Sequence, residues 1–486
     1  MVRDRAARVG RYAPIVFAKV MGAAWIGAVL IAAPLARANG RFPAANRIVL
    51  SPTDPDLVVV RATYGILPSS DHGRSWEFVC EDVLGLSPMA VVDPALELTA
   101  SNALVAGVSL GGLNVSSDTG CTWSCAGGAL AGKAIADLAV RPDAPHTVVA
   151  LTSTIVWSDA GGAWDSRVFQ SVDDGVHWAA LGTALDPALL VTTIDVAPTD
   201  PHRLYVSATR GFGATRSAAL FVSTDDGATW TERPAPLDLA VEVGLYIAGV
   251  DPLDANRVYL RTSGRSRLIV TLDAGQSFQI PVTFVGEMLG FALSPDGSKI
   301  FVGGDQDGLL LGDRATLSFA HRSSLVQGRN GGPFDVHVQC LAAQGAELWA
   351  CADEPSFTVG MSTDDGLTFT PKLHLNGVGA PIRCCASAPS SLGCGADAGG
   401  AYCGGEPFSQ LCLNVGCDGP APDASSPNCA GAGAGPDASL PASKVTRGSS
   451  ACGCRFSGDR SAATIATVSI ALAAAMSRRR KRRRLP

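Results

Sequence analysis

Residues 223–230 read Ser-Thr-Asp-Asp-Gly-Ala-Thr-Trp, and this octapeptide recurs along the chain. Six copies share the pattern Ser/Thr-x-Asp-x-Gly-x-Ser/Thr/His-Trp/Phe, which is too regular to arise by chance. The aspartate can accept hydrogen bonds from backbone N–H groups across a tight turn, the glycine supplies a positive φ, and the aromatic residue anchors the hairpin. We therefore interpret these residues as structural. They are Asp71, Gly73, Trp76, Asp118, Gly120, Trp123, Asp173, Gly175, Trp178, Asp225, Gly227, Trp230, Asp273, Gly275, Phe278, Asp364, Gly366 and Phe369.

The spacing of the copies predicts how many repeats the chain contains. Successive aspartates lie 47, 55, 52, 48 and 91 residues apart, so the last interval is about twice the others. The segment Leu309–Phe319 falls inside that interval and keeps a final aromatic residue, but it has lost the Asp-x-Gly pattern. We interpret it as a divergent seventh copy.

Each copy follows two short apolar segments joined by a proline-containing turn. Residues 47–63, RIVLSPTDPDLVVVRAT, are an example in which Val, Ile and Leu fill the strands while Pro and Asp interrupt them. A third strand leads into the octapeptide and its aromatic residue opens a fourth. Four short strands in about 50 residues are typical of a propeller blade. We expect an all-β fold with a single seven-bladed β-propeller over residues 39–377.

The octapeptide resembles the Asp-box, or BNR, repeat. It is found in sialidases, sortilin-type receptors, xyloglucanase-type glycoside hydrolases and photosystem II assembly-factor propellers, and the similarity covers residues 45–376. The resemblance implies a propeller built from Asp-box hairpins. It does not imply one activity, because these families share the fold while they perform unrelated functions.

The resemblance to sialidases implies a site that this chain matches poorly. Such enzymes use three arginines to bind the substrate carboxylate, a Tyr–Glu pair as the nucleophile and an Asp as the acid. An Arg-Ile-Pro segment usually precedes their first repeat. Here the nearest segment is Arg41-Phe42-Pro43, which is displaced. Tyr205 and Tyr259 occupy equivalent second-strand positions, which indicates packing residues.

A xyloglucanase-like hydrolase would need two facing carboxylates. Candidates outside the octapeptides are Asp195, Asp251, Asp335, Glu242 and Glu287. Asp195 and Asp251 lie on first strands at positions that we interpret as equivalent, so strand alternation could direct both inward. The seven histidines are scattered without metal-ligand spacing, so we expect neither a metal nor a cofactor.

The two ends of the chain indicate export and anchoring. Residues 1–38 combine a basic start, an apolar run and the small-residue site Ala36-Arg37-Ala38, which is typical of a signal peptide, with an uncleaved anchor as the alternative. Residues 461–477 form an apolar stretch, expected to be a transmembrane helix, and a basic tail follows at 478–484. A nucleic-acid-binding tail is disfavoured, because the chain without residues 1–38 and this tail has 25 basic and 43 acidic residues, a formal charge of −18.

Fourteen cysteines fit an oxidising compartment outside the cytoplasm. Cys340 and Cys351 flank neighbouring strands and are candidates for a cross-strand disulfide, and Cys121 and Cys125 could close a small loop. Residues 378–430 are rich in cysteine and predict a disulfide-stapled segment or a solvated loop. Residues 431–450, with Ala, Gly, Pro and Ser, predict a flexible linker.

Residues 451–486 place Cys452 and Cys454 before the apolar stretch and the basic tail. This order is similar to the myxobacterial-type C-terminal sorting signal. The resemblance implies insertion in the membrane, recognition by a sorting protease, and attachment to the envelope through one of the two cysteines. The alternative is a plain C-terminal membrane anchor.

We therefore predict an exported, surface-anchored and non-catalytic propeller that acts as a binding or scaffolding module. Its ligand would be a glycan, a polymer or a protein, and not a nucleic acid. The alternative is a sialidase-like or xyloglucanase-like glycoside hydrolase, and an assembly factor for another envelope protein is a third possibility.

Overall fold

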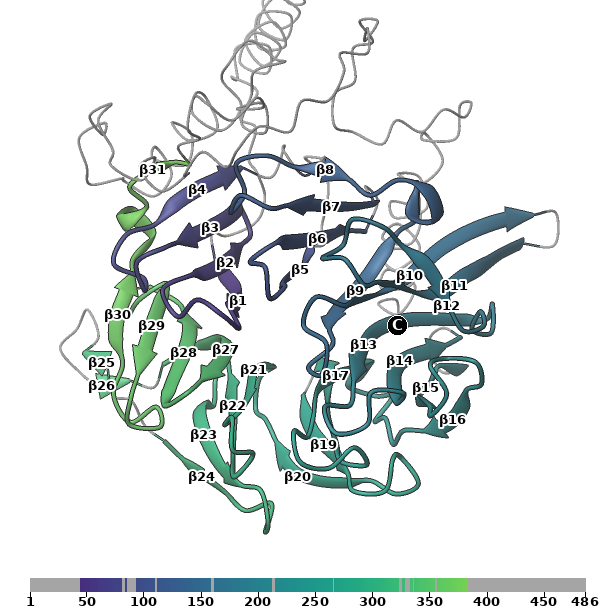
Figure 1. Cartoon of the computed structure of the whole chain (residues 1–486). Helices are drawn as coiled ribbons and strands as arrows, with labels where there is room; N and C mark the ends of the chain where they lie inside the picture. Colours follow the sequence, from purple (N-terminus) through teal and green to yellow (C-terminus); the bar gives the residue numbers. More distant parts are fainter. Residues whose placement is uncertain are drawn as a thin grey trace, which may run out of the picture. The chain divides into compact units, whose positions relative to one another are not determined.

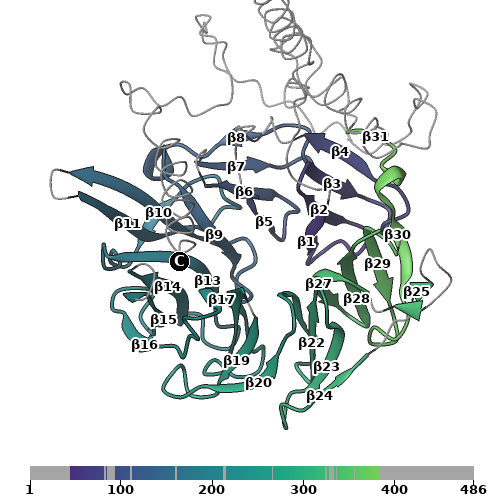
Figure 2. The ribbon, with the colours of Figure 1, turned by 180° about the vertical axis from the view of Figure 1, so that it is seen from behind.

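Short runs of Val, Ile and Leu form the strands, because β-branched and aliphatic side chains favour this conformation. Turns that contain Pro, Asp and Gly separate the runs. A computed structural model describes residues 44–382 except positions 81–83, 85–92, 110–111, 159–160, 212–214, 265, 323–325, 328–332, 335 and 355. These residues all belong to one compact unit that begins at Pro43. Their strands form seven sheets of four or five strands around a central axis, which confirms the seven-bladed all-β propeller (Figures 1 and 2).

The first four blades follow one another along the chain. Blade 1 contains β1 (Ala45–Leu50), β2 (Val58–Ala62), β3 (Gly65–Ser69) and β4 (Glu77–Cys80), with β31 (Ala380–Pro381) at its outer edge. Blade 2 contains β5 (Ala95–Leu98), β6 (Leu104–Val108), β7 (Gly112–Ser116) and β8 (Ser124–Cys125). Blade 3 contains β9 (Ile135–Val140), β10 (Val148–Ser158), β11 (Gly161–Ser171) and β12 (Ala179–Leu181). Blade 4 contains β13 (Leu189–Val196), β14 (Leu204–Arg210), β15 (Ser217–Ser223) and β16 (Thr231–Pro234).

The remaining blades complete the ring. Blade 5 contains β17 (Glu242–Val250), β18 (Val258–Gly264), β19 (Arg267–Thr271) and β20 (Gln279–Thr283). Blade 6 contains β21 (Met288–Leu293), β22 (Lys299–Gly304), β23 (Gly308–Asp313) and β24 (Phe319–His321). Blade 7 contains β27 (Val338–Gln344), β28 (Glu347–Ala352), β29 (Val359–Ser362) and β30 (Thr370–Leu373). A two-stranded hairpin, β25 (Val326–Gln327) and β26 (Pro333–Phe334), lies between blades 6 and 7 in the chain, and 3₁₀ turns are formed by Gly128–Leu130 and Leu375–Gly377.

The ring closes through the last described segment. β31 pairs parallel with β4, so the chain returns from blade 7 to the outer edge of blade 1. The N–H of Ile382 donates a 2.9 Å hydrogen bond to the carbonyl of Phe78, and the indole N–H of Trp76 donates to the carbonyl of Lys372 at 3.0 Å. The final aromatic residue of the first octapeptide therefore joins the first blade to the last.

The core lies between neighbouring blades. One cluster of buried side chains spans blades 1, 2 and 7 and includes Trp76, Phe78 and Trp349, which are at most 3% exposed. Each further cluster contains residues of two successive blades. Every blade thus buries its faces against its neighbours, which is how sheets with two apolar faces are stabilised.

The ring has two distinct ends. The inner strands begin at one end, which we call the hairpin face because the long β10–β11 hairpin extends there. The turns that follow the third strand of each blade lie at the other end, which we call the octapeptide face. Turns on the octapeptide face contact their neighbours, as in the bond from Arg141 Nη2 to the carbonyl of Pro201 at 2.5 Å and that from Lys299 Nζ to Asp365 at 2.7 Å.

The structure confirms one predicted disulfide and corrects the other. Cys340 and Cys351 are register partners on β27 and β28, their Cα atoms lie 4.8 Å apart, and they are bonded. Cys121 and Cys125 do not bond to each other. Cys121 is in a disulfide, whereas the Cys125 thiol donates a 3.3 Å hydrogen bond to Asn114 Oδ1, and Cys80 is also disulfide-bonded.

Several sequence predictions lie outside the described residues. These are the signal peptide, most of the cysteine-rich segment, the linker, the apolar stretch at 461–477, the basic tail, Cys452 and Cys454, and the candidate Asp335. Within the part of the chain that the structure describes, no helix has the length and apolar character that crossing a membrane requires.

Candidate functional site

The inner strands of blades 1 to 4 carry charged side chains near the axis of the ring, which we call the channel. Arg47 on β1, Glu97 on β5, Asp137 on β9 and Asp195 on β13 belong to this group, and Arg61 pairs with Arg47 across β1 and β2. We call these five residues the channel cluster. A bulge in β1, β9 and β13 interrupts the register near the hairpin face, and bulges reorient the side chains beside them.

Arginines connect blades 1 and 2 at this channel. Arg47 forms an ion pair with Glu97 and donates a 3.1 Å hydrogen bond from Nε to the carbonyl of Leu96. Arg61 donates to the carbonyl of Pro94 at 2.6 Å and to Asn46 Oδ1 at 2.8 Å. The side chains of Arg47 and Glu97 keep 39% and 16% of their accessible surface, so they border the channel although protein surrounds them.

The two aspartates of the cluster connect blades 3, 4 and 5. Asp137 Oδ2 accepts a 3.0 Å hydrogen bond from the N–H of Ile194 on the next inner strand. Asp195 Oδ1 accepts from the N–H of Val196 at 2.8 Å, and Oδ2 accepts from Val250 on β17 at 3.1 Å. Each carboxylate therefore satisfies a backbone donor of the following blade.

The enclosed channel changes the protonation of these carboxyl groups. Burial raises the pKa of Glu97 and of Asp137, and the positive charge of Arg47 opposes the rise. Burial raises the pKa of Asp195 to about 7, and the negative charges of Asp137 and Glu97 add to the rise although backbone hydrogen bonds oppose it. Burial and the neighbouring negative charges therefore favour the protonated form of Asp195.

The two arginines shift in opposite directions. The charge of Glu97 raises the pKa of Arg47, whereas burial and the neighbouring charge of Arg47 lower the pKa of Arg61 to about 10. In the described residues, no group of three or more His, Cys, Asp and Glu side chains is arranged to hold a metal ion. The cluster can bind or position charged and hydrogen-bonding groups.

Of the other predicted carboxylates, two are tied to arginines away from the channel cluster. Glu242 is fully buried and accepts hydrogen bonds of 2.5 and 2.6 Å from Arg267. Asp251 is also fully buried and accepts two from Arg314. Glu287 accepts a 3.3 Å hydrogen bond from the N–H of Gly264.

The predicted equivalence of Asp195 and Asp251 is wrong by two residues. The N–H groups of Ala197 and Asp251 make the same 3.0 Å turn bond, to the carbonyls of Arg203 and Arg257, so these two residues are equivalent. Asp195 instead matches Gly249, since their strand partners are Tyr205 and Tyr259. The sequence itself contains this offset, since Pro198 and Pro252, like Tyr205 and Tyr259, lie 54 residues apart, whereas Asp195 and Asp251 lie 56 apart.

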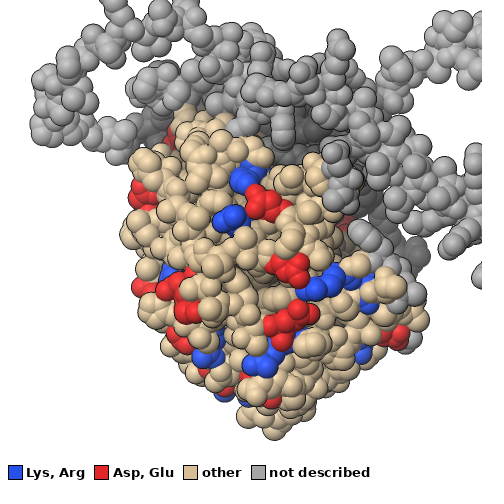
Figure 3. Space-filling model, turned by 90° about the vertical axis from the view of Figure 1, so that its right-hand side faces the viewer, with Lys and Arg blue, Asp and Glu red and all other residues tan. Residues whose placement is uncertain are grey.

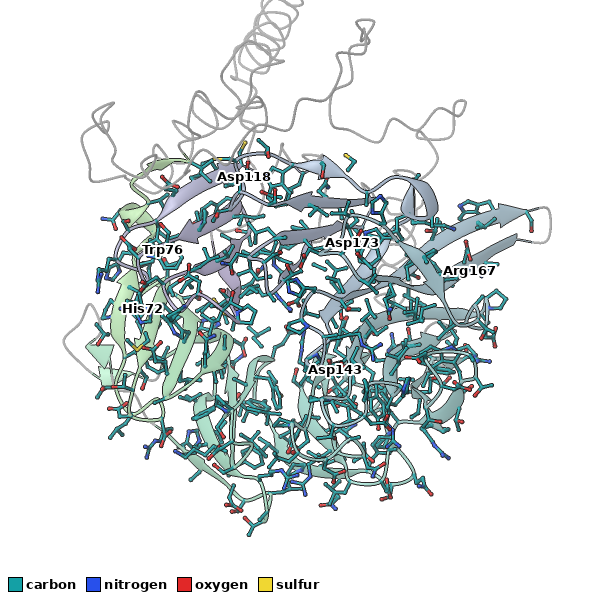
Figure 4. The ribbon with its side chains drawn as sticks, viewed as in Figure 1. His72, Trp76, Asp118, Asp143, Arg167 and Asp173 are labelled. Atoms are coloured by element: carbon teal, nitrogen blue, oxygen red, sulfur yellow. A yellow bond between two sulfur atoms is a disulfide. The ribbon has the colours of Figure 1, made fainter. Side chains whose placement is uncertain are left out.

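The six octapeptides form one repeated hydrogen-bond arrangement. The hydroxyl at the first position donates to the aspartate at 2.7–2.8 Å and accepts from the glycine N–H at 2.7–2.9 Å. The aspartate accepts from the seventh N–H at 2.8–2.9 Å. Figure 4 shows Asp118 and Asp173 in two of these turns. Their carboxylates are occupied by the turn itself.

The turn needs two consecutive residues with positive φ, which the sequence pattern did not reveal. Gly175 has φ of +88°, and the preceding Asp174 has φ of +57°. The same position holds His72, Thr119, Asp226, Ala274 and Asp365 in the other copies, with φ between +54° and +62°. Asn, Asp and His tolerate this conformation better than most residues.

Exposed aliphatic side chains gather on the hairpin face of blades 4 to 6. They lie at the start of an inner strand or in the segment that leads to it. We call them the hairpin-face patch, and its members are Leu190, Leu239, Val241, Val243 and Val285, each 36–72% exposed. A separate hollow of about 510 Å³ on the outer strands of blade 6, lined by Lys299, Asp313 and Phe319, lies away from the channel cluster.

Charged side chains on the outer surface of the ring are mixed in sign. Figure 3 shows basic and acidic residues next to one another on the side that it displays, over a surface that is mostly uncharged. Ion pairs of the ring include Lys133 with Asp165, 2.5 Å apart, and Arg210 with Asp186, 3.1 Å apart.

Sequence reasoning identified Asp195 but missed the other members of the channel cluster. Arg47, Glu97 and Asp137 all stand among apolar neighbours in the first strand of a blade, and this was the signal that could have found them. A charged side chain in a strand that lines the axis has no solvent-facing sheet surface to occupy.

No protein-family model matches the chain, and no curated protein matches it by sequence. Solved structures match its fold. An ancestral GH74 enzyme is 14% identical with a TM-score of 0.42, and the match covers 68% of this chain and 54% of the enzyme, about half of its length. The β-propeller domain of Cps50 (Swd1) from Myceliophteria thermophila is 10% identical with a TM-score of 0.42, covering 66% of this chain and 96% of the domain. The GH74 xyloglucanase from Xanthomonas campestris is 14% identical with a TM-score of 0.22, covering 66% and 67%. These similarities concern the fold alone.

Proposed function

We propose that this chain is an exported, surface-anchored binding module whose ligand contacts the hairpin face. The hairpin-face patch carries the proposal, because exposed apolar side chains that gather on one face of a domain are typical of interaction sites. Gly264 connects two segments of the patch. Its backbone lies against the carbonyl of Val241, and its N–H donates a hydrogen bond to Glu287, two residues after Val285.

The chemistry of the patch favours a protein or another polymer with apolar groups. Its members are aliphatic, so they offer area for hydrophobic contact. Asp307 accepts hydrogen bonds from the N–H groups of Val285 and Gly286 at 2.9 and 3.1 Å, which holds this part of the surface in place. A preorganised surface loses less entropy when it binds.

The proposed location rests on the sequence of the two ends. Residues 1–38 would direct export, and the segment 451–486 would be inserted in the membrane, recognised by a sorting protease and attached to the envelope through Cys452 or Cys454. Replacing both cysteines by alanine is expected to release the protein or leave it in the inner membrane, which fractionation and surface labelling would detect. Unchanged surface display would contradict this part of the proposal.

Pull-down of envelope proteins and polymers with the purified protein tests the binding role. Val241→Asp and Val285→Asp are expected to abolish capture of a ligand that the wild-type protein retains. Val176→Asp is the matched control and should leave capture unchanged, because Val176 is 57% exposed on the octapeptide face. Equal capture by all variants would place the ligand elsewhere and reject the hairpin-face patch.

A glycoside hydrolase is the second candidate, and the carboxyl group of Asp195 is the observation that favours it. Its pKa of about 7, beside Glu97 and Asp137, suits a general acid. Assays on sialosides and β-glucans test this reading. Turnover that Asp195→Asn abolishes, in a protein that remains folded, would overturn the non-catalytic proposal.

A further inference from the structure

The hairpin of β10 and β11 extends beyond the sheet to which it belongs (Figure 1). Both strands have 11 residues, whereas β9 pairs with β10 only as far as Thr152, and β12 pairs with β11 only at Val168–Gln170. The N–H of Ser153 still donates to the carbonyl of Ala134 at 2.9 Å. Beyond that bond, β10 is an edge strand of a two-stranded ribbon. It pairs with β11 on one side, and on the other side, where β9 pairs with it nearer the ring, it pairs with no described strand.

The register shows which backbone groups point outward from this edge. The N–H of Trp164 donates to the carbonyl of Pro187 at 2.9 Å, so the peptide groups of Trp164 point away from β10. Trp164 is the register partner of Ile155, and in an antiparallel pair both partners then point away from each other. The same applies two residues later to Trp157. Among the described residues, none supplies a hydrogen-bond partner for the outward N–H and C=O groups of Ile155 and Trp157.

The side chains of this edge are apolar and exposed. Ile155, Val156 and Trp157 are 38%, 51% and 64% exposed, and residues 148–158 contain no charged side chain, proline or glycine. Proteins usually protect an edge strand with charges, proline, a bulge or a covering segment, because its unpaired backbone groups otherwise bind another strand. This edge has none of these protections in its described residues beyond Thr154, whose hydroxyl accepts a hydrogen bond from the N–H of Ala134.

We propose that this edge pairs with the same edge of a second copy of the chain, in antiparallel register centred on Val156. Ile155 of one copy then exchanges two backbone hydrogen bonds with Trp157 of the other, and the symmetric pair does the same. The four outward N–H and C=O groups of Ile155 and Trp157 are thereby hydrogen-bonded in each copy. The two ribbons form one four-stranded sheet with two-fold symmetry.

The sequence of the edge is complementary to itself in this register. Ile155 lies opposite Trp157 of the second copy, Val156 opposite Val156, and Thr154 opposite Ser158, so no like charges meet. Aliphatic–aromatic cross-strand pairs of this kind stabilise sheets. Within one copy, Trp157 covers Gly162, where an added Cβ would lie 3.0 Å from the indole, and Ile155 is paired with Trp164. Pairing would therefore extend these contacts into one apolar row across four strands.

The contact is small, and this sets the strength that we expect. Pairing along an edge of six residues buries less surface than the interfaces of stable complexes, which bury about 1,200–2,000 Å². The association should therefore depend on protein concentration. It is independent of the hairpin-face patch, which lies on blades 4 to 6, and loss of one would not remove the other.

Disulfide trapping in the full-length chain tests both the association and its register. Val156→Cys places two thiols at a non-hydrogen-bonded antiparallel pair, where Cα atoms lie about 4.5 Å apart and a disulfide can form. Oxidation with copper phenanthroline, followed by a non-reducing gel, is expected to give a dimer that the wild-type chain with its native cysteines does not give. Thr154→Cys and Ser158→Cys should each fail to cross-link, and the double variant should cross-link.

A second variant tests the edge without an engineered thiol. Ile155→Pro removes an outward N–H and no bond within the ribbon, so the hairpin should remain folded. Sedimentation of the full-length protein over a range of concentrations is expected to show a dimer for the wild type and a monomer for the variant. Failure of Val156→Cys to cross-link above the wild-type level, or equal cross-linking by Thr154→Cys, would overturn the proposal.

Discussion

The carboxylate of Asp251, which follows β17, accepts hydrogen bonds of 2.7 and 2.8 Å from the guanidinium group of Arg314 in the divergent repeat of blade 6. That repeat still forms a turn. Asp313 accepts a 2.8 Å hydrogen bond from the N–H of Thr316, and Leu317 adopts φ of +52°. The copy that lost the Asp-x-Gly pattern therefore still joins its blade to the preceding one, through the ion pair of Arg314 with Asp251.

Replacing Arg314 by methionine is expected to lower the free energy of unfolding by about 3 kcal/mol, because a fully buried carboxylate loses its partner. The pKa of Asp251 is lowered, because the hydrogen bonds from Arg314 and Leu253 outweigh the opposing effect of burial. The group is therefore ionised in the wild type. Urea unfolding measures the change. The double variant Asp251→Asn/Arg314→Met should recover part of the loss, and additive losses would contradict the coupling.

The fold could be predicted from the sequence because its determinants are local and repeated. Each octapeptide satisfies its own hydrogen bonds within eight residues, and the spacing of Asp71, Asp118 and the later copies set the number of blades. The channel cluster could not be predicted in the same way. Arg47 and Glu97 lie 50 positions apart in the sequence, and Asp137 and Ile194 lie 57 apart, so these contacts depend on how blades pack around the axis.

The cysteines show the same contrast between local and distant pairing. Cys340 and Cys351 are partners across one hairpin, which the sequence predicted. Cys121 and Cys125 are even closer in the sequence, but Cys125 lies on β8 and its thiol donates a hydrogen bond to Asn114 on β7 instead. Proximity along the chain does not determine which thiols meet when a strand directs alternate side chains to opposite faces.

Replacing Cys340 and Cys351 by serine is expected to lower the free energy of unfolding by about 2–4 kcal/mol, since the bond closes a loop of 11 residues in the unfolded chain. Thermal unfolding with and without a reducing agent measures the effect of this bond. Each single variant controls for the loss of one side chain, and reduction should destabilise the wild type more than the double variant. An unchanged unfolding temperature in the double variant would contradict the prediction.

Asp364→Asn is expected to flatten the acid dependence of stability. Hydrogen bonds from the backbone N–H and the hydroxyl of Thr368 lower the pKa of Asp364 to about 2 in the folded protein. A lowered pKa means that the ionised group contributes stability above its unfolded pKa of about 4, and that this contribution is lost as the pH falls toward 2.

The Asp364→Asn variant should therefore be less stable than the wild type at pH 7, with a difference that shrinks as the pH falls to about 2. Unfolding in urea at several pH values measures this difference. Thr368→Val removes one of the two donors and should give a smaller change in the same direction. A difference that stays constant between pH 7 and 2 would show that ionisation of Asp364 does not stabilise the turn.

Asp195→Asn is expected to have the opposite dependence on pH. Burial raises the pKa of Asp195 to about 7 in the folded state, above its unfolded value of about 4. The protonated form is therefore favoured by folding, and stability is lost as the pH rises from about 4 through 7. Because the variant cannot ionise at this position, its stability relative to the wild type should increase over this range and level off above pH 8.

Asp186→Asn, in which the original carboxylate is 45% exposed and pairs with Arg210, is the control and should follow the wild type between pH 5 and 8. Parallel curves for Asp195→Asn and the wild type would show that the channel does not retain a proton at Asp195.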